Sequence, residues 1–174
     1  MSRVVRWFDL DEEFTIGFAT IGGKDVFITE EAVRFDAPLI RVHETLREAV
    51  LRKCFLDEED LENSEEKRYF NRTLKNATKK YEEEKKRLML LWFLDTMDAT
   101  FSNYDCMKSY KFDRDTRTMW LSEEENDGYI WSALDGALIL WNSQNKPYYI
   151  ICDENAPDKN GMIKWEFEIC KEGE

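Results

Sequence analysis

A stripe of basic side chains in the middle of the chain has a spacing that suggests a binding function. Arg68, Arg72, Lys75, Lys79 and Lys86 recur at i, i+4, i+7, i+11 and i+18, which places them on one face of a helix. The apolar residues of the same stretch fall on roughly the opposite face, and they are Phe70, Leu74, Ala77, Tyr81, Leu88 and Leu91. The stripe is therefore either the solvated side of an amphipathic helix or a ridge that binds phosphate groups or an acidic partner.

Catalytic chemistry finds little support in the sequence. The single histidine, His43, stands beside Val42 and Glu44 in an amphipathic stretch, where we expect a structural role and not a place in a Ser/His/Asp or Cys/His arrangement. The chain has no GxxxxGK[ST] and no GxGxxG motif for binding phosphates or dinucleotides. We therefore expect a protein that is not an enzyme, has no catalytic residue and needs no cofactor.

Potential metal ligands follow no pattern typical of a metal site. The four cysteines lack CxxC spacing, which suits reduced thiols in a cytoplasmic protein better than a zinc site. Two carboxylate pairs, Asp95/Asp98 and Asp113/Asp115, could hold a divalent metal as in nucleases, but turns and helix ends contain the same residues. We expect no metal site.

The first third of the chain alternates with the period of β-strands. This alternation predicts strands over residues 3–9, 14–21 and 25–29, with a tight turn at Gly22 and Gly23 where glycine accepts positive φ.

Helical spacing follows these strands. It predicts a helix over residues 41–56 and, after an acidic linker over residues 57–62, a second and long helix that runs to about residue 98. Asn63 or Ser64 can cap this second helix.

Beyond residue 100 the pattern returns to period two. The stretch "SYKFDRDTRTMWLS" predicts a hairpin, and "GYIWSALDGALILWNSQNKPYYIICD" predicts two or three strands with turns at Asp135-Gly136 and over residues 142–147. Residues 162–170 alternate cleanly between apolar and charged side chains. The C-terminal part is therefore expected to be a mostly antiparallel sheet, which makes the whole chain α+β.

The opening stretch, "VVRWFDLDEEFTIGFATIGGKDVFI", resembles the start of a cold-shock domain, a small OB-fold barrel that binds single-stranded RNA and DNA. The family has an apolar-basic-Trp-Phe strand, a Gly-Phe-Gly-Phe-Ile strand and a Lys-Asp-Val-Phe-Val-His strand. The chain matches this pattern over residues 5–8, at Gly17 and Phe18, and over residues 24–28. The resemblance covers about residues 3–33 only.

The resemblance implies a non-enzymatic regulator that binds single-stranded RNA or DNA through an aromatic face. In the family, alternating residues of the sheet stack on bases, and each stacked base contributes about 1–3 kcal/mol. The implied stacking residues are Trp7, Phe8, Phe14, Phe18 and Phe27. For a protein with this function we expect Arg6 and Lys24 to bind phosphates, together with Arg68, Arg72, Lys75 and Lys79 of the basic stripe.

Several positions depart from the family pattern. Ile16 stands where the family has the first platform Phe, Thr29 stands at the His position, and Glu30 stands at the aromatic position that follows. Four carboxylates between residues 9 and 13 lie in the loop that a nucleic-acid strand would approach. Two alternatives follow. Either the binding face is retained, or the helices or a partner protein cover the aromatic residues of a retained barrel.

An OB-fold needs five strands, so other segments must complete the barrel. Residues 1–36 supply the first three cold-shock-like strands, and residues 108–121 can complete the barrel after a helical region or insertion over residues 37–98. Otherwise the first three strands join an antiparallel β region over residues 99–174, and the similarity is local.

The net charge of −12 limits the ligands that the chain can attract. Phosphates bind cationic surfaces, so nucleic acid can bind only through a local basic patch. Residues 63–94, with nine basic and five acidic side chains, contain such a patch. The overall acidity equally suits a basic protein surface, such as part of the transcription machinery. The many Trp and Tyr residues of a small acidic chain resemble those of phage-encoded host modulators.

Three functions therefore remain open. The first is a single-stranded nucleic-acid regulator, the second an acidic protein-interaction factor that does not itself bind nucleic acid, and the third a metal-dependent nuclease. The first is favoured because the motif match is both specific and mechanistic. No run of 18 apolar residues and no secretory signal are visible, so we expect a cytoplasmic protein with no membrane partner.

Overall fold

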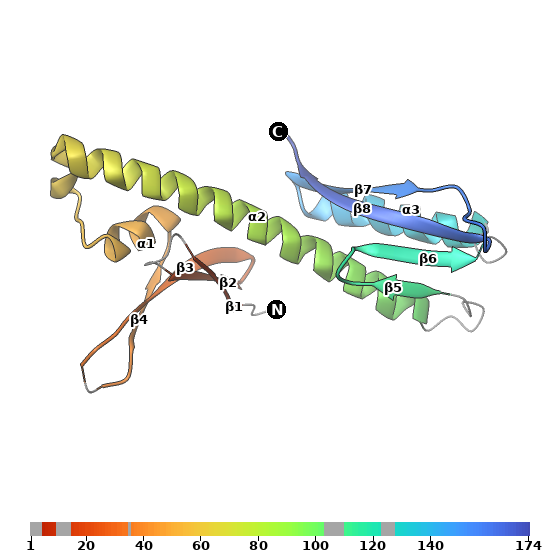
Figure 1. Ribbon diagram of the computed structural model, residues 1–174, viewed down its shortest axis with the longest axis horizontal. Helices are drawn as coiled ribbons and strands as arrows, with labels where there is room; N and C mark the ends of the chain where they lie inside the picture. The colour runs from red at the N-terminus through yellow and green to blue at the C-terminus, as the bar shows by residue number, and fades with distance from the viewer. Residues whose placement is uncertain (1–4, 10–14, 35, 103–109, 123–127) are drawn as a thin grey trace. The chain divides into compact units, whose positions relative to one another are not determined.

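The computed structural model in Figure 1 describes residues 5–9, 15–34, 36–102, 110–122 and 128–174, and for residues 5–9 and 128–131 it describes the backbone. The chain divides into two compact units, Met1–Glu84 and Lys85–Glu174. The long helix α2 (Ser64–Ser102) contributes residues to both units. Each unit contains a four-stranded antiparallel sheet, which confirms the predicted α+β class.

The sheet of the first unit is a meander in the order β1-β2-β3-β4. Its strands are β1 (Val5–Asp9), β2 (Thr15–Ile21), β3 (Lys24–Glu31) and β4 (Leu39–His43). The three strands predicted within residues 3–29 are confirmed. The predicted turn is confirmed as well, since Gly22 and Gly23 have φ angles of +60° and +79°, which glycine adopts because it lacks a Cβ.

This sheet is open in the part of the chain that the structure describes. β1 and β4 are its two edges and do not pair with each other. The hairpin predicted over residues 108–121 forms as β5 (Lys111–Asp113) and β6 (Thr118–Ser122), but β6 pairs with β8 (Met162–Lys171) in the other sheet. The expected barrel, completed by this hairpin, is therefore wrong for the described residues, because the second sheet already holds these strands.

The helix predicted over residues 41–56 is shorter than expected. Its first residues belong to β4, and α1 spans only Leu46–Lys53. Thr45 sets the start of α1, because its backbone is still extended and its side-chain oxygen accepts the N–H of Glu48 at 3.2 Å. The β-branched residues of β4 pair with β3, and this long-range pairing outweighs their helical spacing.

The end of α1 holds a left-handed residue that is not glycine. The N–H of Leu56 donates to the carbonyl of Leu51 at 3.0 Å and the N–H of Phe55 donates to that of Arg52 at 3.1 Å, which is a Schellman motif. Phe55 has a φ of +52°, and 77% of its surface is exposed. A side chain in this conformation costs roughly 1–2 kcal/mol, so Phe55 is a strained position that burial does not explain.

The second predicted helix is confirmed and extends beyond its expected end. A short 3-10 helix, Glu59–Glu62, lies in the acidic linker. Asn63 then caps α2, since its side-chain oxygen accepts the N–H groups of Glu65 at 3.0 Å and Glu66 at 3.3 Å. Although α2 has 39 residues, neither it nor any other helix of the described segments is apolar enough to cross a membrane.

The sheet of the second unit has the order β5-β6-β8-β7, with β7 spanning Tyr148–Glu154. The alternation predicted over residues 162–170 is confirmed, because Ile163, Trp165 and Phe167 are buried on one face of β8. Side chains of α2 and α3 pack against this face. The buried helical residues of this core are Leu90, Phe93, Leu94, Met97, Phe101, Leu134 and Leu138.

The strands predicted within residues 128–144 are wrong, because this segment forms the helix α3 (Gly128–Gln144). Leu134 and Leu138, four residues apart, are buried, whereas Ile139 is 63% exposed. Since apolar residues occur on several sides of this helix, they show no clear helical period. The Asp-Gly pair ending at Gly136 lies inside the helix and does not form the expected turn.

Two substitutions of Phe55 test the strain at the end of α1. We expect Phe55→Gly to unfold with a free energy about 1 kcal/mol higher than Phe55→Ala, because only glycine adopts this φ without a Cβ clash. Both variants remove the same ring, so the comparison isolates the backbone. Urea unfolding of the two variants measures the difference, and equal stability would contradict the strain.

Candidate functional site

The aromatic residues of β2 and β3 lie on one face of the N-terminal sheet. The cross-strand register places Phe18 beside Phe27 and Ile16 beside Thr29. Their exposed fractions are 2% for Phe18, 6% for Phe27 and 0% for both Ile16 and Thr29. This face is therefore the hydrophobic core of the first unit, and it is not an open surface.

Tyr81 of α2 covers the aromatic face. Its ring centroid lies 5.2 Å from that of Phe18 and 5.0 Å from that of Phe27, with edge-to-face geometry in both pairs. Its hydroxyl donates to one oxygen of Asp25, whose other oxygen accepts from Thr20 Oγ1 at 2.7 Å. Stacking of bases on Phe18 and Phe27 is thus not available in this structure, because the apolar side of α2 and the aromatic face bury each other.

The structure does not describe the side chains of the other predicted stacking residues. The backbone of β1 pairs with β2, with Trp7 opposite Gly17. The side chains of Arg6, Trp7 and Phe8 are not among the described ones, and Phe14 precedes the first described residue of β2.

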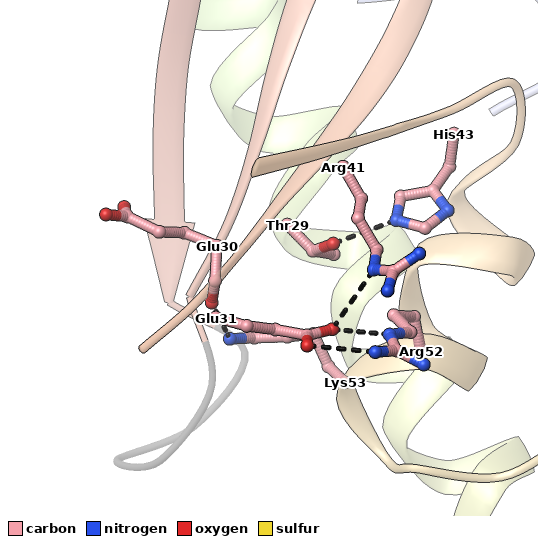
Figure 2. A network of polar contacts seen from close by, with 7 residues as sticks. All are labelled: Thr29, Glu30, Glu31, Arg41, His43, Arg52 and Lys53. Carbon is pink, nitrogen blue, oxygen red and sulfur yellow. Dashed lines mark hydrogen bonds and ion pairs between the residues drawn. The ribbon is translucent and has the colours of Figure 1, made fainter. Parts of the chain in front are cut away.

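A polar cluster connects β3, β4 and α1 (Figure 2). The Glu31 carboxylate pairs with Arg52, through one contact of 2.9 Å and a second shorter one, and with Arg41 at 3.5 Å. The hydrogen bond from Arg52 lowers the pKa of Glu31. Thr29 Oγ1 lies 2.8 Å from Nε2 of His43. These contacts hold the edge strand β4 onto the unit and account for its polar residues structurally.

The environment of His43 favours the neutral imidazole. Partial burial lowers the pKa of His43, and the positive charges of Arg41 and Arg52 lower it further. The carboxylates of Glu48 and Glu31 oppose this shift without reversing it.

The opposite face of the sheet is largely apolar, and we call it the outer face. The register places on this side, away from Phe18, the charged residues Lys24 and Glu30 and the aliphatic residues Ala19, Ile21, Val26, Ile28, Ile40 and Val42. It is closed at Ala19, which is 4% exposed, and open along β4. Ile21, Ile40 and Val42 are 56%, 61% and 64% exposed. In Figure 2 the Glu30 side chain points away from the polar cluster, so its carboxylate lies on the outer face beside Ile40, whereas Lys24 stands at the other end of β3 opposite Ile21.

The predicted phosphate-binding residues with described side chains are exposed. They are Lys24 at the β2–β3 turn and Arg68, Arg72, Lys75 and Lys79 on α2. Lys86, the last residue of the stripe, pairs with Glu174 in the second unit. The aromatic face and the basic stripe are therefore separate features, since the first is buried and the second is accessible.

The carboxylates considered as metal ligands have structural partners. Asp95 pairs with Arg114 at 3.2 Å, and Asp98 accepts the hydroxyl of Tyr110 at 2.7 Å. Asp113 accepts two backbone N–H groups in the β5–β6 turn. Among the residues that the structure describes, no three His, Cys, Asp or Glu side chains are grouped so that they could hold a metal ion.

Comparison with known proteins identifies no relative: no family model matches the chain, and neither a curated protein nor a solved structure is significantly similar to it. The cold-shock resemblance of residues 3–33 therefore stays a prediction.

The sequence pattern does not mark the outer face as a candidate site. Alternation along β2 places Gly17, Ala19 and Ile21 on one side and the aromatic residues on the other, so both sides of the strand are apolar. The alternation alone could not tell which side was buried. The spacing places Tyr81 among the apolar residues of its helix. It does not reveal the contacts of Tyr81 with the sheet, because the residues that it contacts lie more than 50 positions away in the chain.

A double-mutant cycle tests whether Tyr81 covers the aromatic face in solution. We expect Tyr81→Phe and Asp25→Ala each to lower the free energy of unfolding, with a coupling of about 1 kcal/mol between them, because the first removes the donor and the second the acceptor of the same charge-assisted hydrogen bond. Urea unfolding of the two single variants and the double variant measures this coupling. Strictly additive effects would contradict the contact.

The pH dependence of stability tests the environment of His43. Its folded pKa lies below the usual 6.5, so the unfolded chain binds more protons at this residue, and His43 lowers the stability progressively as the pH drops from 6.5 towards 5 but not above pH 6.5. We expect His43→Gln to remove this part of the pH dependence in urea unfolding at pH 7.5 and 5.5. Because the chain has one histidine, NMR titration of its ring reports the pKa directly. A value at or above 6.5 would contradict the assignment.

Proposed function

We propose that this chain is a non-enzymatic protein-interaction factor that binds an extended, basic segment of a partner protein along β4 and the outer face. The observation that carries the proposal is the combination of an edge strand with exposed aliphatic residues. Ile40 and Val42 are each more than half exposed on β4, which has no second strand neighbour among the described residues.

Edge strands with free backbone groups are the surfaces to which extended peptides add. The N–H and C=O groups on the outer side of such a strand bind the peptide backbone, and alternate side chains give specificity. Natural edge strands usually carry charges that prevent this addition. On β4 the central charge, Arg41, is turned to the Glu31 cluster on the buried side, while the outer face presents Ile40 and Val42.

Charge favours a basic partner. Glu30 stands beside Ile40 on the outer face, and the whole chain carries a net charge of −12. Cationic segments associate with such a chain faster than acidic ones do, and complementary charges help to fix how the two strands align. We therefore expect the partner strand to carry basic residues between the aliphatic residues that contact Ile40 and Val42.

The proposal takes the second of the three functions considered from the sequence. The burial of Phe18 and Phe27 under Tyr81 removes the support that the cold-shock resemblance lent to stacking on the sheet. The structural contacts of His43, Asp95 and the other candidate groups support a function without catalysis.

Two short peptides test the proposal. We expect a hexapeptide of alternating Ile and Lys to bind the full chain and to slow hydrogen exchange of the amides of residues 39–43, and the matching Ile/Glu peptide to bind far more weakly. The double variant Ile40→Thr/Val42→Thr should weaken binding at least tenfold, because burial of an aliphatic side chain contributes about 1.5–3 kcal/mol. Isothermal titration calorimetry measures the affinities.

Ile139→Thr is the matched control, since Ile139 is similarly exposed but lies on α3. Equal binding of both peptides, or protection of amides elsewhere, would contradict the proposal. A dimer in sedimentation equilibrium that is lost in the double variant would identify a second copy of the chain as the occupant instead.

A further inference from the structure

The four cations at the N-terminal end of the basic stripe form a straight track on α2. Arg68, Arg72, Lys75 and Lys79 are separated by four, three and four residues, which places them within about 60° of one another around the helix axis. With a rise of about 1.5 Å per residue, the track is roughly 16 Å long. All four side chains are exposed.

These cations differ in their partners from six other basic residues of the chain. Arg41, Arg47, Arg52, Lys86, Arg114 and Lys164 each pair with a carboxylate. None of the ion pairs found among the described residues includes a member of the track. Like charges four residues apart destabilise a helix by about 0.2–0.5 kcal/mol per pair. A bound anion would relieve this repulsion.

An aromatic side chain lies beside the track. Arg68, Tyr69 and Arg72 line a shallow surface hollow together with Glu65, and the guanidinium of Arg72 lies 5.9 Å from the centroid of the Tyr69 ring. Tyr69 is 37% exposed. Cations along a backbone track with an aromatic ring at its side are the components with which proteins bind single-stranded nucleic acids. An acidic peptide would use the cations but would have no base to place on Tyr69.

We propose that the track binds the phosphates of a single-stranded nucleic acid, with a base placed against Tyr69. The site lies on α2, outside the sheet and outside residues 3–33, and it does not depend on the proposed partner strand at β4. The Glu65 carboxylate repels phosphate and ends the track at the start of the helix. The net charge of −12 opposes the approach of any polyanion, so binding is weak and strongly dependent on salt.

Fluorescence anisotropy with labelled 12-nucleotide DNA and RNA of one sequence tests the proposal on the full chain. Each phosphate contact contributes about −0.7 to the slope of log K against log salt for single strands. We therefore expect a slope of about −3 for the native chain, and about −1.4 for Lys75→Gln/Lys79→Gln, which removes two contacts. Tyr69→Ala should weaken binding about fivefold or more, and Tyr69→Phe should bind as the native chain does.

Lys111→Gln/Lys159→Gln is the matched control, because it changes the net charge equally at two exposed lysines that are not part of α2. An unchanged slope in this control supports the track. Equal losses in both double variants would show general electrostatics and overturn the proposal. Competition by oligoglutamate as strong as that by the oligonucleotide would also overturn it and make the ligand an acidic peptide. Ile40→Thr/Val42→Thr should leave nucleic-acid binding unchanged, which separates this test from that of the partner strand.

Discussion

The packing of Tyr81 against Phe18 and Phe27 decides which side of the N-terminal sheet faces solvent. The sheet has large apolar residues to bury, and α2 has an apolar side that cannot remain in water. Edge-to-face ring contacts and the hydrogen bond to Asp25 give this mutual burial one geometry. The exposure of the sheet's other face and of the basic side of α2 follows from the choice of this face as the core.

One consequence is an open sheet. A barrel removes its edges by closure, whereas this sheet uses α1 and α2 to cover one face and leaves β4 as an edge. The pairing of Glu31 with Arg52 and Arg41 holds that edge to the unit, because α1 contributes the guanidinium of Arg52. The edge is thereby ordered but not covered, and Ile40 and Val42 stay exposed.

A second consequence is that the chain offers two surfaces of different chemistry. The outer face is largely aliphatic with Glu30 and Lys24 as charged residues, and the opposite side of α2 from Tyr81 carries cations without carboxylate partners among the described residues. A helix that buries one side in a sheet must show its other side to solvent. The same contact that buries Phe18 thus sets the position of the basic track.

The sequence by itself determined the local elements: three strands and their Gly22-Gly23 turn, the cap at Asn63, the long helix and the alternating strand at residues 162–170. These depend on spacing and backbone conformation within a few residues. Tertiary structure alone decided the rest. Pairing with β3 turned residues 39–43 into a strand, and packing on the second core made residues 128–144 a helix. It also buried the aromatic face, because a strand that is apolar on both sides carries no local signal of which side another element will cover.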